Sequence, residues 1–266
     1  MNIEVVNAHG SARIALLGAN VMHYQPAGGE PLLWLSPKSR FVEGTAIRGG
    51  IPICWPWFAK AHPDKPSHGV ARTRLWTHVK TTESAEGTEV VLELRDDATS
   101  RALWPHAFRL ELRVSVGVAL GLTLVHQNLG DQTVECTGAL HAYLAVSDID
   151  AVHVEGLGKT PYFDKIAGLE TRQPGAVTVS GPIDRVYRNT EDAVTLVDGG
   201  SRVRMSKFGS RSTVVWNPWT GAADMADVPD DGYREFICIE AANAGDDIVS
   251  IAPGGEHRLG AIWSGA

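Results

Sequence analysis

The sequence predicts an all-β fold, an antiparallel β-sandwich formed by many short strands. Three observations predict it: apolar and polar residues alternate with a period of two, turn-forming clusters interrupt the chain at short intervals, and helical periodicity is scarce. A chain of 266 residues is also long enough to bury a large core without disulfides. No linker or change of composition divides it, so we expect a single domain over residues 1–266.

The alternation is clearest in residues 108–116, where Leu110 and Leu112 point one way while Arg109 and Glu111 point the other. The same pattern predicts strands over residues 88–95, 120–124, 134–138, 193–197, 202–205, 213–216, 236–240, 247–251 and 257–263. Clusters of Gly, Asp, Asn or Pro separate several of them, at residues 128–131, 198–200, 229–232 and 253–255. We expect one or two helical turns around residues 99–104.

Composition excludes several classes of function. A formal net charge of −7 disfavours nucleic acid as a partner, because binding to phosphate backbones needs a basic surface. No apolar run is long enough to span a membrane, and the N-terminus does not resemble a signal peptide. Cys54, Cys136 and Cys238 are far apart and form no Cys-x-x-Cys pair, which suits a reducing compartment. We therefore expect a cytoplasmic protein, and we expect it to be a monomer.

The segment of residues 47–76 carries the strongest functional signal. Glycines and prolines prevent regular structure there, yet the segment contains four Trp or Phe rings and the guanidinium groups of Arg48, Arg72 and Arg74. The flat apolar faces of aromatic rings beside planar, positively charged guanidinium groups suit a sugar that carries a phosphate. The alternative interpretation is a solvated arginine-rich loop whose tryptophans belong to the core.

Two further residues have the chemistry of an acid–base pair. His141 lies in an otherwise apolar stretch, residues 138–146, and Glu240 closes an apolar strand. By itself, a histidine in such a stretch is more often a core residue than a catalyst, and Glu240 is equally compatible with a strand-end glutamate turned out to water. Facing each other, they would combine a partly protonated imidazole with an ionised carboxylate near neutral pH, because the ordinary pKa values of His and Glu side chains are about 6.5 and 4.3. Such a pair suits proton transfer on a hemiacetal and needs neither metal nor cofactor.

Other catalytic patterns are missing from the sequence. His62 and His68 have no third partner at the spacing of a zinc site, and the acidic cluster at residues 224–227 does not continue as a calcium loop. There is no Gly-x-Ser-x-Gly motif, no phosphate-binding Walker loop and no dinucleotide fingerprint. We therefore predict no metal and no cofactor.

The motifs occur together in the order seen in one known family. The chain resembles hexose-6-phosphate mutarotases, also called glucose-6-phosphate 1-epimerases, a branch of the aldose 1-epimerase superfamily. The resemblance runs from about Arg48 to the C-terminus, and it departs from the usual pattern at Val70 and Ala59, where no polar group is lost. It is carried by the motifs at residues 47–52, 68–72, 140–143, 184–187, 215–219 and 238–240.

The resemblance implies a galactose-mutarotase-like β-sandwich and assigns roles to single residues. It implies that His141 is the general acid and Glu240 the general base. The remaining predicted site residues are expected to contact the substrate, at its phosphate or sugar (Arg48, Arg72) or at its hydroxyls (His68, Asp184).

Some assignments have rivals. Arg74 is a spare candidate for the phosphate, and Asp184 has an alternative role as the partner of Arg185 or Arg188. Our candidates for stacking against the sugar ring are three tryptophans, each of which would also suit the core: Trp55, Trp57 and Trp219.

The sequence thus predicts an isomerase that interconverts the anomers of a hexose 6-phosphate, with glucose 6-phosphate as the expected substrate. Its partner is a small phosphorylated sugar. Two alternatives stay open at this stage. One is an aldose 1-epimerase that acts on free sugars, and the other is a carbohydrate-binding protein without catalysis.

Overall fold

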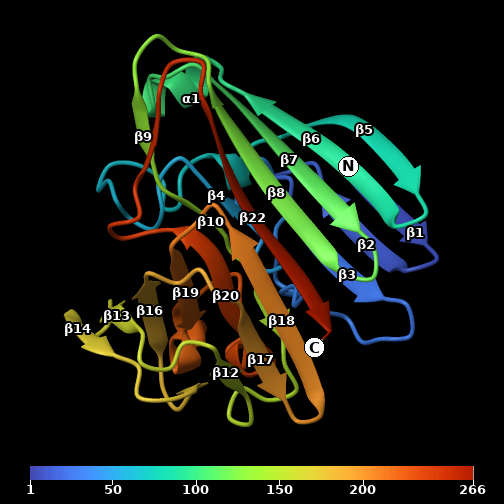
Figure 1. The fold of residues 1–266 in the computed structure, drawn as a ribbon, viewed down its shortest axis with the longest axis vertical. Helices are drawn as coiled ribbons and strands as arrows, with labels where there is room; N and C mark the ends of the chain where they lie inside the picture. The colour runs from blue at the N-terminus through green and yellow to red at the C-terminus, as the bar shows by residue number, and fades with distance from the viewer. Residues whose placement is uncertain (266) are drawn as a thin grey trace.

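The computed structural model describes residues 1–265. Almost all of its regular structure is β-strand, and all the strand pairs within its sheets are antiparallel. A nine-stranded and an eight-stranded sheet form the two large layers, accompanied by sheets of three and two strands (Figure 1). The predicted all-β antiparallel fold is confirmed.

The nine-stranded sheet has the order β15-β12-β17-β18-β22-β8-β7-β6-β5. Its centre follows the predicted alternation, because Leu112 pairs with Leu124 and Leu110 with His126 across β7 and β8. The strands span Thr77–Ser84 (β5), Gly87–Arg95 (β6), Phe108–Val116 (β7), Leu120–Asn128 (β8), His153–Glu155 (β12), Val177–Thr178 (β15), Val194–Asp198 (β17), Ser201–Phe208 (β18) and Glu256–Gly265 (β22).

The eight-stranded sheet has the order β14-β13-β16-β19-β20-β10-β4, and β11 also pairs with β20. Its central strand β20 is buried along its whole length and continues to Asn243, beyond the predicted end at residue 240. The strands span Ile53–Cys54 (β4), Gly138–Leu140 (β10), Tyr143–Ala145 (β11), Pro161–Asp164 (β13), Leu169–Arg172 (β14), Ile183–Arg188 (β16), Ser212–Asn217 (β19) and Phe236–Asn243 (β20).

The smaller elements complete the fold. Asp97 and Ser100 form a capping box that starts α1, which confirms the expected helical turn. The strand predicted over residues 134–138 is instead divided between two sheets, because β9 pairs with β21 and β10 with β20. The remaining elements are β1 (Asn2–Asn7), β2 (Gly10–Ala15), β3 (Val21–Pro26), β9 (Val134–Cys136), β21 (Val249–Ile251), α1 (Ala98–Leu103), η1 (Ala71–Thr73), η2 (Trp219–Asp224) and η3 (Gly232–Glu235).

The main core contains inward-facing side chains from both large sheets. Ile237 and Ile239 of β20 belong to the same buried cluster as Leu259 and Trp263 of β22. Successive side chains of a strand point to opposite faces, so Glu240 lies on the other face of β20 from Ile237 and Ile239. That second face of the eight-stranded sheet carries the candidate active site.

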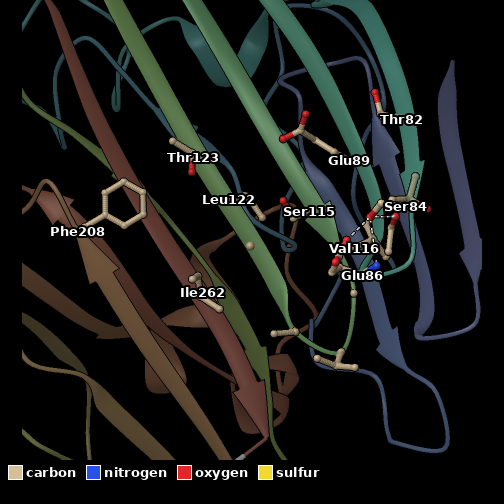
Figure 2. Close-up of a pocket in the computed structure, with 16 residues that line it drawn as sticks. Thr82, Ser84, Glu86, Glu89, Ser115, Val116, Leu122, Thr123, Phe208 and Ile262 are labelled. Atoms are coloured by element: carbon tan, nitrogen blue, oxygen red, sulfur yellow. Dashed lines mark hydrogen bonds between the residues drawn. The ribbon is translucent and has the colours of Figure 1, made fainter.

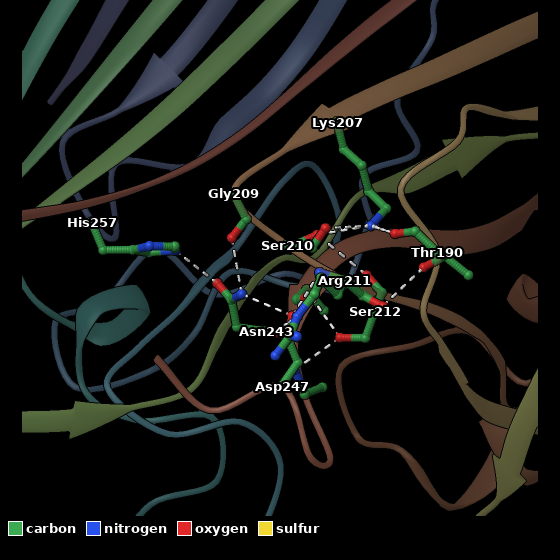
Figure 3. A network of polar contacts seen from close by, with 11 residues as sticks. Thr190, Lys207, Gly209, Ser210, Arg211, Ser212, Asn243, Asp247 and His257 are labelled. Atoms are coloured by element: carbon green, nitrogen blue, oxygen red, sulfur yellow. Dashed lines mark hydrogen bonds and ion pairs between the residues drawn. The ribbon is translucent and has the colours of Figure 1, made fainter. Parts of the chain in front are cut away.

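A polar network joins the two large sheets at the end of β20 (Figure 3). The amide nitrogen of Asn243 donates to the carbonyl of Gly209 at 3.0 Å and to Asp247 at 2.9 Å, while its oxygen lies 3.2 Å from His257 Nε2 on β22. These bonds satisfy buried polar groups and fix the end of the strand. They therefore hold the part of β20 that includes Glu240.

Candidate active site

His141 and Glu240 lie opposite each other in the eight-stranded sheet. Antiparallel pairing of β10 with β20 matches Leu140 to Ala241, and the same register resumes in β11, where Tyr143 matches Cys238. The register therefore places His141, in the gap between β10 and β11, opposite Glu240. The imidazole Nε2 lies 3.4 Å from the carboxylate Oε1.

All six predicted site residues line one pocket of about 250 Å³. They are His141, Glu240, Arg48, His68, Arg72 and Asp184. The pocket also contains residues to which the sequence assigned no role in the site: Phe58, Ser67, Lys165, Val214 and Trp216. The sheet provides its floor, and the irregular segment of residues 47–76 provides much of its wall.

Glycines allow that segment to pack closely against the rest of the molecule. Gly69 follows His68 with φ +73°, and an added Cβ would lie only 2.0 Å from the carbonyl oxygen of Trp55. Gly49 follows Arg48 with φ +102°, and an added Cβ would lie 2.5 Å from the carbonyl oxygen of Trp34. Glycine is required at both positions because any side chain would meet backbone. The neighbouring His68 and Arg48 are thereby held at the pocket.

Burial changes the proton affinities of the central pair. The side chain of Glu240 is 1% exposed, and burial raises its pKa well above the ordinary value, assisted by the charge of Asp184. Burial also lowers the pKa of His141 well below its ordinary value, and His68, Arg72 and Arg48 lower it further. The expected combination of an ionised carboxylate and a partly protonated imidazole is therefore disfavoured in the free pocket, which prefers the neutral forms.

Two polar atoms of the pair have no hydrogen-bond partner within residues 1–265. They are Nδ1 of His141 and Oε2 of Glu240, and both are buried. Buried polar atoms are nearly always paired, and exceptions are common at functional sites. These two atoms of the pair are therefore left without the hydrogen bonds that such groups usually form.

His68 is a neutral side chain at the edge of the pocket. Its pKa is lowered to about 2, first by burial and then by the charge of Arg72. The backbone N–H of Ala59 donates to its Nδ1 at 3.3 Å, so the neutral ring carries its proton on Nε2. His68 can therefore offer an N–H donor to a sugar hydroxyl.

The three cations of the pocket differ in their partners. Arg48 donates from Nε to Asp227 at 3.1 Å and from Nη1 to the hydroxyl of Tyr143 at 2.9 Å. Lys165 forms an ion pair with Asp184 at 2.8 Å. Arg72 donates to the carbonyl of Ser67 at 2.9 Å, and within the described chain it forms no ion pair and its buried Nε has no partner. Arg72 thus carries the charge least compensated by the protein.

Several rival assignments are wrong. Arg74 forms an ion pair with Asp97 and does not line the pocket. Asp184 pairs with Lys165, whereas Arg185 and Arg188 pair with other acidic residues.

The expected stacking tryptophans also lie elsewhere. Trp55 packs in the core against Trp104 and Phe108, and neither Trp57 nor Trp219 lines the pocket. Trp216 and Phe58 supply the aromatic walls instead. Trp216 lies within one of the recognised motifs, whereas Lys165 lies in a hairpin turn without any sequence signal.

A larger hollow, of about 410 Å³, lies on the exposed face of the nine-stranded sheet (Figure 2). Half of its lining residues are Thr, Ser or Gly, and Phe208 and Ile262 lie on one side. Glu86 and Glu89 are the titratable residues among those drawn, and no imidazole faces them. It contains no acid–base pair, unlike the pocket that holds His141 and Glu240.

The chain is similar to known proteins of one family. Residues 1–262 match the family described as aldose 1-epimerase. A protein of Escherichia coli K12 named "Putative glucose-6-phosphate 1-epimerase" is 38% identical over 242 residues, which cover 88% of this chain and 80% of the relative. A protein of Cenchrus ciliaris with the same name is 35% identical over 93% of this chain and 79% of its own length.

Solved structures of mutarotase-type proteins share the fold of this chain. The crystal structure of a mutarotase candidate from Salmonella typhimurium is 34% identical with a TM-score of 0.93, covering 100% of this chain and 90% of that one. A galactose mutarotase related enzyme from Lactobacillus acidophilus shares the fold at 14% identity, with a TM-score of 0.79 and coverage of 100% and 97%. The chain belongs to the aldose 1-epimerase family and is an isomerase of the mutarotase type.

Proposed function

We propose that the chain interconverts the α and β anomers of a hexose 6-phosphate, with glucose 6-phosphate as the expected substrate. One observation carries the proposal: a buried imidazole–carboxylate pair lines the same pocket as a guanidinium, that of Arg72, which has no ion-pair partner among residues 1–265. The pair suits opening of a hemiacetal ring, and the guanidinium suits a phosphate. The name of the Escherichia coli relative supports the choice of glucose 6-phosphate.

Ring opening needs one proton removed and one proton supplied. Glu240 as the ionised base takes the proton of the anomeric hydroxyl, and protonated His141 donates a proton to the ring oxygen. The bond between C1 and the ring oxygen breaks, and its electrons stay on that oxygen. The product is an open-chain aldehyde beside a protonated Glu240 and a neutral His141, so atoms and charges balance.

Ring closure is the reverse process after rotation about C1–C2. Neutral His141 takes the proton of the ring hydroxyl while Glu240 returns its proton to the former carbonyl oxygen, now on the other face. The free pocket already prefers the neutral forms of both residues. Since the ion pair and the neutral pair hold the same number of protons, binding of the cyclic sugar only needs to move one proton within the pair.

The phosphate is assigned to the arginines of the pocket. A phosphate monoester carries close to two negative charges near pH 7, because its second pKa is roughly 6. We propose Arg72 as its main contact and Arg48 as a further contact to phosphate or sugar, since Arg48 already interacts with Asp227 and Tyr143. His68 and Asp184 are proposed to contact hydroxyls.

The cellular setting is also a proposal. The three cysteines are free and buried, which suits a reducing compartment, and we propose a cytoplasmic enzyme that acts as a monomer. No helix among residues 1–265 combines the length and hydrophobicity needed to cross a lipid bilayer.

Exchange NMR between anomers tests the proposal. We expect the enzyme to speed the exchange of glucose 6-phosphate strongly and that of glucose weakly, with glucose competing poorly. Equal acceleration of both sugars would favour a free-sugar epimerase, and exchange at the spontaneous rate would favour a binding protein without catalysis. The control variant is Arg74→Gln, which removes a guanidinium of the same segment, residues 47–76, that does not line the pocket.

A further inference from the structure

The imidazole of His141 lacks the partner that usually orients a catalytic histidine. Such rings commonly donate from their second nitrogen to a carboxylate or a carbonyl, which fixes both orientation and tautomer. The Nδ1 atom of His141 is buried and has no hydrogen-bond partner among residues 1–265. Another kind of contact must therefore hold the ring in place.

Aromatic packing supplies that contact. The ring of Tyr143 lies nearly parallel to the imidazole, with centroids 4.9 Å apart and planes inclined by 9°. Trp216 and His68 approach edge-on, with centroids 6.0 and 5.6 Å away. Tyr143 follows His141 by two positions in the register of β20, so both side chains lie on the same face of the sheet.

Tyr143 is in turn held by hydrogen bonds that involve two charged residues, Arg48 and Asp227. Arg48 Nη1 donates to the Tyr143 hydroxyl at 2.9 Å, and Arg48 Nε donates to Asp227 Oδ2 at 3.1 Å. The backbone around both charged residues is fixed as well. Ser36 Oγ donates to the carbonyl of Asp227 at 2.6 Å, and the N–H of Ser36 donates to the carbonyl of Arg48 at 3.0 Å.

We propose that Asp227, Arg48 and Tyr143 form a positioning chain that holds the His141 imidazole, by ring stacking, at the orientation required for proton transfer. The inference rests on the proposed function in taking His141 as the general acid. Arg48 would then help to position His141 in addition to contacting the substrate. Asp227 and Tyr143 would act by positioning His141 without contacting the sugar.

The test compares substitutions that interrupt the positioning chain at different residues. Tyr143→Leu removes the stacked ring, and we expect kcat to fall about 100-fold, the size expected for a misplacement of roughly 1 Å, with KM nearly unchanged. Tyr143→Phe keeps the ring and removes the hydroxyl, and Asp227→Asn removes the charge at the far end. Each should lower kcat about ten-fold, as expected for one lost charged hydrogen bond, and the double variant should be no slower than the slower single one.

Matched controls separate positioning from general loss of structure. Tyr187→Phe removes another buried hydroxyl of the same sheet, which donates to Gln173 at 2.9 Å. Asp230→Asn removes a nearby carboxylate that pairs with Lys38 at the surface. Both controls should retain wild-type kcat.

An NMR measurement tests the stacking without any substrate. The ring protons of His141, assigned by comparison with His141→Asn, should show the ring-current shift of an overlying aromatic ring. The shift should persist in Tyr143→Phe and disappear in Tyr143→Leu. A His141 signal that is unchanged in Tyr143→Leu, or folded variants of Tyr143 and Asp227 that raise KM at constant kcat, would overturn the positioning chain. If the wild-type enzyme left the anomers of hexose 6-phosphates exchanging at their spontaneous rate, the proposed function would be overturned instead.

Discussion

The imidazole Nε2 of His141, between β10 and β11, and the carboxylate Oε1 of Glu240, on the paired strand β20, lie 3.4 Å apart. Each group also has one buried polar atom without a hydrogen-bond partner among residues 1–265, which is Nδ1 of the histidine and Oε2 of the glutamate. The pair therefore resembles a preorganised site that costs stability, which leads to a prediction about the fold itself.

Replacing Glu240 with methionine should stabilise the protein while it abolishes catalysis. Burial raises the pKa of Glu240, so the folded protein must hold a proton that the unfolded chain releases near pH 7. This cost is absent at low pH and grows as pH rises toward the folded-state pKa. Urea unfolding of Glu240→Met should show a gain of about 1–2 kcal/mol at pH 8 and a smaller one at pH 5. A loss of stability at pH 8 would mean that the carboxylate has a stabilising partner.

Arg72→Gln should impair recognition of phosphate more than recognition of sugar. Arg72 forms no ion pair within the described chain, so its charge is available to the substrate. Loss of a charged hydrogen bond should raise KM for a hexose 6-phosphate by about 10–100-fold, and KM for the free hexose should change little. Steady-state kinetics with both sugars measure this, with Arg74→Gln as the control. Equal changes for both sugars would assign Arg72 to the sugar ring or to structure.

His126 should make the fold sensitive to mild acid. Its pKa is lowered to about 3 by burial, and Trp55 Nε1 donates to its Nδ1 at 3.3 Å. Between pH 6.5 and 3 the unfolded chain binds a proton that the native ring does not, so the free energy of unfolding should fall by about 1.4 kcal/mol per pH unit from this residue.

Chemical denaturation between pH 7 and pH 5 checks this slope. The variant His126→Gln, whose side-chain oxygen can still accept from Trp55, should flatten it. His78→Gln, at an exposed position on β5, should leave the slope as in the wild type. A variant of His126 with an unchanged slope would show that other groups cause the acid sensitivity.

Much of the fold could be predicted because its central strands alternate strictly. Strands β6, β7 and β8 show the period of two, since one face of each packs in the core. Strand β5 shows no such signal, because all its residues are exposed and its pattern is unconstrained. The end of β20 also lies beyond the predicted one, because Ala241 and Ala242 continue the strand without alternation.

The candidate site was predictable in its residue types and less so in its contacts. The motifs identified six residues that the fold brings into one pocket. Sequence could not reveal Lys165 or Asp227, because each reaches its partner from a turn whose position depends on the tertiary structure. It also could not give the protonation of the central pair, because burial by the surrounding sheet and loop determines both pKa shifts.

The exchange rate between the anomers of glucose 6-phosphate, measured by NMR for His141→Asn, Glu240→Gln and the double variant, tests the acid–base pair most directly. We predict that each single variant loses about 10²–10⁴-fold in kcat, and that the double variant is hardly slower, because the two groups act in one step. Folded single variants that exchange the anomers at the wild-type rate would contradict the assignment of both residues.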